Sequence, residues 1–167
     1  MTNIWIISDT HFNDEKIIAP FSRPFANAKQ ANECMIENWN SIIKADDEVW
    51  HLGDVYAGPA IDAELILRSL KGRKKLLLGN HDRGKDALLQ SVFEEIEMWK
   101  AFPDLGILMT HVPVDVSVLG KGPFKGKPCV NVHGHIHSRP APTDHHRCVC
   151  VEHTGYKPIN IEELREK

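Results

Sequence analysis

Long hydrophobic segments are absent from this sequence of 167 residues. The apolar run near its start, residues 4–7, is far shorter than the roughly 20 residues of a membrane span, and no basic residue precedes it as in a signal peptide. We therefore expect a cytoplasmic protein with no membrane partner. Internal repeats and tracts of Pro, Gly or Ser long enough for a linker are absent too, which predicts one domain over residues 1–167.

Cysteine is also scarce, and the sequence has no excess of positive charge. The four cysteines have neither zinc-knuckle nor disulfide-framework spacing, so we expect free thiols. A formal net charge of -3 gives no general attraction for a polyanion, which makes bulk nucleic-acid binding unexpected. Any phosphate must therefore be bound at a local site. Hydrophobic residues at 42% and charged residues at 26% are typical of a globular protein.

Short apolar runs alternate with stretches of helical periodicity. Asn27 and Gln30 stand like an N-cap and its N3 partner at the start of the longest helical stretch, and Asn160 and Glu163 repeat this arrangement near the C-terminus. The pattern predicts strands at residues 3–7, 48–52, 74–78, 93–99, 106–110, 128–133 and 147–152, and helices at 27–44, 59–70, 85–90 and from 160. This order favours a mixed, layered α/β fold.

Histidine, by contrast, is plentiful: there are ten, about half of them in short clusters with Asp, Asn and Gly. Polar residues of the metal-ligating type follow five of the predicted strands directly. Because the carboxyl ends of neighbouring strands meet at one edge of a sheet, these side chains should converge there. They are Asp9 and His11, Asp54, Asn80 with His81 and Asp82, His111, and His135 with His137.

Each of these residues also has an ordinary explanation. Aspartate and asparagine suit turns and helix caps, and a single histidine after a strand is usually a hydrogen-bonded structural residue. These explanations are independent of one another, whereas a shared metal site accounts for all the residues together. Gly53, Gly79 and Gly134 fit that interpretation, since glycine lets the backbone turn sharply before a ligand.

In chain order, Asp9-x-His11, Gly53-Asp54, Gly79-Asn80-His81-Asp82, His111 and Gly134-His135-x-His137 resemble the five motifs of the calcineurin-like metallophosphoesterases. The sequence looks closest to the small, single-domain bacterial and phage members. That closer similarity is carried by Arg23-Pro24-Phe25, Glu37-Asn38-Trp39-Asn40 and His51-Leu52-Gly53-Asp54. Asn13-Asp14 departs from the Gly-His that similar sequences often carry after His11-Phe12.

The resemblance implies an α/β fold, a four-layer α/β/β/α sandwich of two mixed β-sheets flanked by helices, with a dinuclear metal centre at the strand ends. It also implies a role for each motif position. Asp9, His11 and His137 would hold one ion, Asn80, His111 and His135 the other, and Asp54 would bridge the two. His81 would remain unligated.

The implied activity is hydrolysis of a phosphate mono- or diester, a nucleotide or another small molecule, by a hydroxide that bridges two divalent metal ions. A bridging carboxylate such as Asp54 offsets the repulsion between the ions. The mixed oxygen and imidazole ligands favour manganese, with iron, zinc, nickel, cobalt or magnesium as alternatives.

Several residues near the motifs are candidates for acid–base chemistry and substrate binding. His81 is positioned to donate a proton to the departing oxygen, and Asp82 could orient and charge it. Arg83 and Arg139, and less strongly Arg23, are candidates for gripping phosphate in a bidentate manner. His51 and His133 are expected to form hydrogen bonds that support the site.

Two other functions compete with small-molecule hydrolysis. A nuclease or polynucleotide phosphatase is disfavoured by the acidic balance and by the lack of an aromatic-rich basic groove. A non-catalytic metal-binding scaffold is disfavoured by the intact ligand set. A second metal site at His145, His146, Cys148 and Cys150 is also conceivable, but these residues lack four-ligand spacing and packing roles are favoured.

Overall fold

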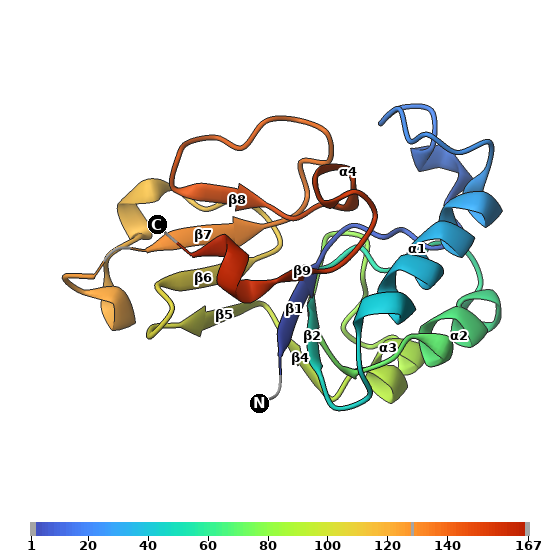
Figure 1. The fold of residues 1–167 in the computed structure, drawn as a ribbon, viewed down its shortest axis with the longest axis horizontal. Coiled ribbons are helices and arrows are strands. Elements are labelled where there is room, and N and C mark those ends of the chain that lie inside the picture. Colours follow the sequence, from blue (N-terminus) through green and yellow to red (C-terminus); the bar gives the residue numbers. More distant parts are fainter. Residues whose placement is uncertain (1–2, 128, 166–167) are drawn as a thin grey trace.

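Two β-sheets form the centre of the computed structural model, which describes residues 3–127 and 129–165 (Figure 1). The first sheet has the order β4-β3-β2-β1-β9 and the second the order β5-β6-β7-β8. Both are mixed: β9 runs antiparallel to β1 and β5 antiparallel to β6, while the other neighbours are parallel. The strands are β1 (Ile4–Ile7), β2 (Glu48–His51), β3 (Arg73–Leu77), β4 (Glu95–Glu97), β5 (Trp99–Phe102), β6 (Ile107–Thr110), β7 (Val130–His133), β8 (His146–Cys148) and β9 (Ile159–Asn160).

Three helices, α1 (Ala28–Ile42), α2 (Ala60–Ser69) and α3 (Ala87–Val92), cover one side of the first sheet in Figure 1. The Asn27 side chain caps α1 by accepting the Gln30 N–H, as the sequence predicts. Ala31, Met35 and Trp39 recur every four residues along α1 and are buried against the sheet. This apolar stripe anchors α1.

Alternate residues of the first sheet face opposite layers. Ile7 and Val49 pack toward the helices, whereas Ile6 and Trp50 belong to the core between the two sheets. Met109 and Val132 are among the residues that line that core from the second sheet. Burial on both faces explains why β1, Ile4–Ile7, is apolar throughout.

The outer face of the second sheet is covered by the loop of residues 112–127. The backbone of Val114 joins this loop to the sheet, because its N–H donates to Asn131 Oδ1 at 2.9 Å and its carbonyl lies 2.8 Å from His146 Nε2. Two 3-10 turns, η2 (Val116–Val118) and η3 (Gly122–Phe124), lie in the loop. The predicted sandwich is therefore confirmed, with 3-10 turns rather than α-helices in its fourth layer.

Other segments differ in detail from the sequence predictions. The run expected as one strand at 93–99 divides into β4 and β5, which lie in different sheets. The strand expected at 147–152 ends early, and its last residues begin α4 (Val151–Thr154), because a short apolar run does not distinguish a strand from a buried helical turn. The C-terminal helix is a 3-10 turn, η4 (Ile161–Leu164), with the predicted Asn160–Glu163 capping box. Pro128, the expected start of a strand, lies outside the described residues.

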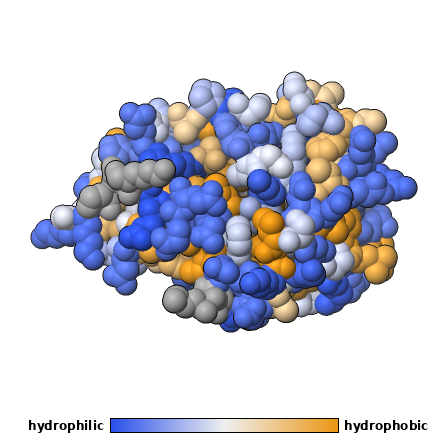
Figure 2. Space-filling model, in the orientation of Figure 1, coloured by the Kyte–Doolittle hydropathy of each residue, from blue (hydrophilic) through white to orange (hydrophobic). Residues whose placement is uncertain are grey.

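On the face drawn in Figure 2, hydrophilic residues cover most of the surface and apolar residues form smaller patches between them. Among the described residues, no helix has both the length and the apolar character needed to cross a membrane.

Candidate metal centre

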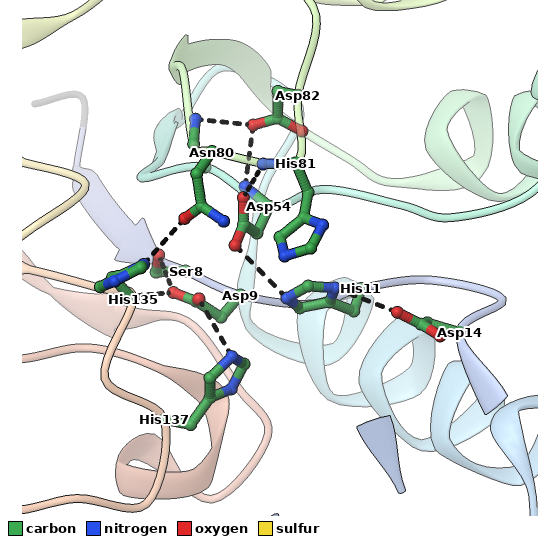
Figure 3. A network of polar contacts seen from close by, with 12 residues as sticks. Ser8, Asp9, His11, Asp14, Asp54, Asn80, His81, Asp82, His135 and His137 are labelled. Carbon is green, nitrogen blue, oxygen red and sulfur yellow. Dashed lines mark hydrogen bonds and ion pairs between the residues drawn. The ribbon is translucent and has the colours of Figure 1, made fainter. Parts of the chain in front are cut away.

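The seven predicted ligands lie just beyond the carboxyl ends of five strands, and their side chains lie close together. Figure 3 labels all of them except His111. Those of the first sheet follow β1, β2 and β3, and those of the second follow β6 and β7. The loops after β1 and β2 remain paired, since the Asp9 N–H donates to the Gly53 carbonyl and the His11 N–H to that of Asp54. Strand pairing thus continues into the site.

Asp9, His11 and His137, here called the first group, are all buried, and one potential ligand atom from each lies within 4.8 Å of the others. Asp9 Oδ1 and His11 Nε2 are buried without a hydrogen-bond partner. Nearly all buried polar atoms in proteins are paired, so these two atoms are suited to bind a shared ligand. An oxygen and an imidazole nitrogen in that arrangement fit a divalent cation.

Asp54, His111 and His135, the second group, also bring their ligand atoms within 4.8 Å of one another. Asn80 adds a carbonyl oxygen, which lies 2.9 Å from His111 Nε2 and 2.8 Å from His135 Nδ1. Asp54 Oδ2 lies 3.5 Å from both His11 Nε2 and His111 Nε2. One carboxylate oxygen therefore faces both groups, as a bridging ligand must.

The Asp54 carboxylate is held in its charged form. Burial alone would raise its pKa, but the nearby His11 and His111 rings and the hydrogen bond from the His81 N–H hold that pKa well below the usual range. Asp54 therefore presents a negative charge at neutral pH. This charge would offset the cost of burying a cation beside it.

His51 supports the loops rather than binding at the centre. Burial lowers its pKa to about 3, so the ring is neutral. Its Nδ1 accepts the Gly53 N–H at 3.1 Å, which leaves Nε2 to donate to Thr10 Oγ1 at 2.9 Å, and Thr10 donates in turn to the Val55 carbonyl. This chain ties the loop after β1 to the loop after β2.

The backbone at the predicted ligands is unusual. Of the eight non-glycine residues with positive φ in the described chain, five are predicted ligands. Such conformations are unfavourable by about 1–3 kcal/mol each and persist where the surrounding structure imposes them, most often at functional sites. The five residues are Asp9 (57°), His11 (47°), Asp54 (58°), His135 (69°) and His137 (51°).

Two motif glycines are required for different reasons. Gly53 has φ +97°, so it is a turn residue as expected. Gly134 has no positive φ, although the chain turns tightly after it, with the Ile136 N–H donating to the Gly134 carbonyl at 2.8 Å. A Cβ there would instead overlap Ser8 Oγ and Asp9 Oδ2, because the backbone passes directly beside these atoms.

Substitution of Gly134 by alanine should therefore displace the Asp9 carboxylate. We expect a lower metal content and a lower unfolding temperature, because the added methyl group must push aside a buried hydrogen-bonded carboxylate. Gly84→Ala is the matched control, since its Cβ would meet only Leu78 Cδ1, at 3.3 Å. Elemental analysis and thermal unfolding of both variants check this; equal metal content in the two would contradict it.

Contacts on the far side of the ring orient three of the four ligand histidines. His111 Nδ1 lies 2.7 Å from the Leu52 carbonyl, and His137 Nδ1 lies 3.1 Å from Glu152 Oε1. His11 Nδ1 is 3.4 Å from the Asp14 carboxylate. In each case Nε2 is left to face the centre, as a metal ligand requires. Phe21 further holds His137 by stacking on its ring at 3.8 Å.

Glu152 is a supporting residue that the sequence reasoning missed. It lies in α4, in a segment predicted as strand, and no motif marks it. Burial opposes its charge, yet hydrogen bonding to His137 and the nearby Arg23 guanidinium lower the pKa of its carboxyl. Its contact with His137 in the structure shows that Glu152 supports this histidine.

The prediction that Arg23 contacts substrate is wrong. Its guanidinium donates to Glu152 Oε1 through Nε and to the Thr10 and Asp9 carbonyls through Nη1 and Nη2. The side chain is only 1% exposed. Arg23 therefore positions Glu152 and the loop that carries Asp9, and its hydrogen-bonding capacity is used within the protein.

Asp82 also differs from its predicted role. Its carboxylate accepts the backbone N–H groups of Asp54, Val55 and Gly79 at 2.8–3.0 Å. No hydrogen bond or ion pair among the described residues joins it to the His81 ring. Asp82 thus fixes the loop that carries Asp54 instead of orienting His81, as Figure 3 shows.

His81 stays outside both ligand groups, as expected. Its backbone N–H donates to Asp54 Oδ1 at 2.8 Å, and its exposed ring lies 5.3 Å from the His11 ring between centroids. It borders a cavity of about 340 Å³ that is also lined by five of the seven predicted ligands, and Arg139 and Lys16 line the same cavity. Arg83 lines a neighbouring polar cavity of about 360 Å³ on another side of His81. Lys16 was not identified from the sequence.

The histidines and cysteines outside the motifs form no comparable group. His146 is buried and contacts Thr143 and Val114, whereas His145 is exposed. Cys150 donates its thiol to Asp9 Oδ2 at 3.3 Å, and its pKa is raised by the Cys148 thiol and by burial. Among the described residues, only the two groups above bring three acidic, histidine or cysteine side chains close enough for a metal ion.

The chain is similar to a known protein family, to curated proteins and to a solved structure. The family model of the calcineurin-like phosphoesterase superfamily domain matches residues 2–155. An uncharacterized protein of Methanocaldococcus jannaschii is 31% identical over 97% of this chain and 89% of its own length. The gene 66 protein of Mycobacterium phage L5 is 34% identical over 49% of this chain and 41% of its own. The crystal structure of a protein of unknown function from Aquifex aeolicus has a TM-score of 0.79 and 28% identity, covering 98% of both chains.

Proposed function

Because this chain belongs to the calcineurin-like phosphoesterase superfamily, a family of hydrolases that typically bind divalent metals, we propose that it hydrolyses a small phosphate mono- or diester with two divalent ions. The observation that carries the proposal is the position of Asp54 Oδ2, 3.5 Å from a histidine of each ligand group. The unpaired Asp9 Oδ1 and His11 Nε2 support it.

The seven ligands predicted from the sequence would hold the ions, with Asp54 shared between them. Manganese is the proposed metal, because the oxygen and imidazole donors suit it and no thiolate takes part. When bound, the two ions would supply a hydroxide nucleophile at neutral pH and offset the charge of the phosphate.

The surrounding side chains would bind the substrate and handle the proton. His81 borders the ligand cavity without belonging to either group, so its ring is free to donate a proton to the departing oxygen. Arg139 and Lys16 line the same cavity and carry the positive charge that a phosphate would meet. The contact between Glu152 and His137 keeps Nε2 of that ring toward Asp9.

Metal-free protein restored with one divalent ion at a time tests the function. We expect manganese to restore hydrolysis, and comparing bis-p-nitrophenyl phosphate with p-nitrophenyl phosphate separates diesterase from monoesterase activity. A metal-loaded protein that is inert toward a broad panel of phosphate esters would refute the proposal. If that inert protein also held a stable partner, the scaffold function would take its place.

A further inference from the structure

An apolar groove adjoins the candidate metal centre. It has a volume of about 710 Å³, and its walls include Leu78 beyond β3, Trp99 in β5, Leu108 in β6, and Val112, Val118 and Phe124 in the covering loop. Asn80 and His111, two of the predicted ligands, also line it. The groove is therefore continuous with the centre, and its volume lies within the usual range for small-molecule sites.

Apolar side chains at this groove remain exposed to water. Met98 and Trp99 are 65% and 57% exposed, and Val112 and Val118 are 45% and 44% exposed. Clustered apolar surface of this kind is unfavourable in water unless something covers it, and it commonly marks a binding site. All four side chains line the same cavity, so the patch is hollowed.

The groove has few groups that could recognise a polar ligand. Lys121 is the single permanently charged side chain among the described residues that line it. The Thr110 hydroxyl already donates to the Val112 carbonyl and accepts from Asn131. A nucleobase would leave its hydrogen-bond donors and acceptors unpaired there, whereas an alkyl or aryl group has no hydrogen bonds to lose.

We propose that this groove binds an apolar ester group of a phosphodiester whose phosphate lies at the metal centre, an inference that rests on the proposed hydrolysis. The described residues lining the groove include Asn80 and His111 but not His81, which lines the other two cavities instead. The departing oxygen must lie beside its proton donor, so the group in the groove is the one retained on the product. A retained ester group makes the substrate a diester.

A series of alkyl p-nitrophenyl phosphodiesters tests this with the manganese-loaded protein. The methyl, butyl and octyl esters share one leaving group and differ only in the retained chain. We expect kcat/KM to rise on the order of 10²-fold from methyl to octyl, because each fully buried methylene contributes up to about fourfold. Ester concentrations stay below the point at which micelles form.

Two variants place the effect in the groove. Trp99→Ala and Val118→Asp should each lower the octyl-to-methyl ratio of kcat/KM by about tenfold, through lost apolar contact or an introduced charge. Leu65→Ala is the control: Leu65 is 80% exposed on α2, outside the groove, and its loss should leave the ratio unchanged. In metal-free protein, both groove variants should also weaken the binding of anilinonaphthalene sulfonate, measured by fluorescence.

The outcomes separate this inference from the proposed function. Hydrolysis that is independent of chain length would overturn the groove assignment and leave hydrolysis standing. Failure to cleave any ester with any metal would remove both. Sedimentation that shows a dimer in the unmodified protein, and a monomer for Val118→Asp, would also overturn it by making the groove an interface between copies.

Discussion

Replacement of Asp54 by asparagine is expected to reduce the bound metal from two ions per chain to one or none. The asparagine side chain would keep the oxygen that accepts the His81 N–H at 2.8 Å, so the loop should hold its shape. It would lack the second carboxylate oxygen of Asp54, which lies 3.5 Å from His11 and His111, together with the negative charge. We expect turnover to fall by about 10³-fold or more, equivalent to about 4 kcal/mol of transition-state stabilisation.

Elemental analysis of the purified variant measures the metal content directly. Asp62→Asn is the control, because it removes the same charge from an exposed position on α2. That control should retain both ions and its activity. Two full equivalents of metal in the Asp54 variant would show that this residue does not bridge.

Alanine in place of His81 is expected to lower turnover without loss of metal. The variant should keep both ions, because the His81 ring belongs to neither ligand group, yet lose on the order of 10²- to 10⁴-fold in turnover. A proton donor matters most when the departing oxygen is basic. The loss should therefore be larger for phenyl esters than for p-nitrophenyl esters.

Comparison of the two leaving groups distinguishes proton donation from a structural role. His145→Ala removes an exposed histidine outside the site and should behave as the unmodified protein. A loss for the His81 variant that is equal for both esters, or that is accompanied by loss of metal, would contradict its assignment as a proton donor.

Much of the centre could be anticipated from the sequence because it depends on a rule of sheet geometry. Side chains that follow neighbouring parallel strands emerge at one edge of a sheet, so Asp9, Asp54 and Asn80 meet beyond β1, β2 and β3 although they lie far apart in the sequence. His111 follows β6 of the second sheet, so its place beside them depends on how the two sheets pack. Their assignment as metal ligands remains a prediction.

The supporting residues could not be predicted because no spacing encodes them. Glu152 meets His137 only because α4 turns back toward the centre, and Arg23 reaches Glu152 across 129 residues of sequence. Asp82 stands next to His81, which suggested a pair, but the nearby N–H groups of Asp54, Val55 and Gly79 hold its carboxylate. Competition among hydrogen-bond partners is visible only in three dimensions.

Parts of the fold could not be predicted from the sequence either. Strand periodicity correctly marks the apolar residues at 93–99, but it does not reveal that the chain leaves one sheet and enters the other between β4 and β5. The fourth layer was expected to be helical by resemblance. The glycines and prolines of residues 113–127 instead favour short 3-10 turns, such as η3 with Pro123 in its first turn.

Each ligand group takes side chains from both sheets. Asp9 and His11 follow β1 of the first sheet, whereas His137 follows β7 of the second, and the second group is divided in the same way. An ion bound at either position would link the two sheets, and its binding free energy would oppose their separation. Depletion of metal would then abolish activity and would also shorten the lifetime of the protein, because the sheets would separate more often and expose the chain to proteases.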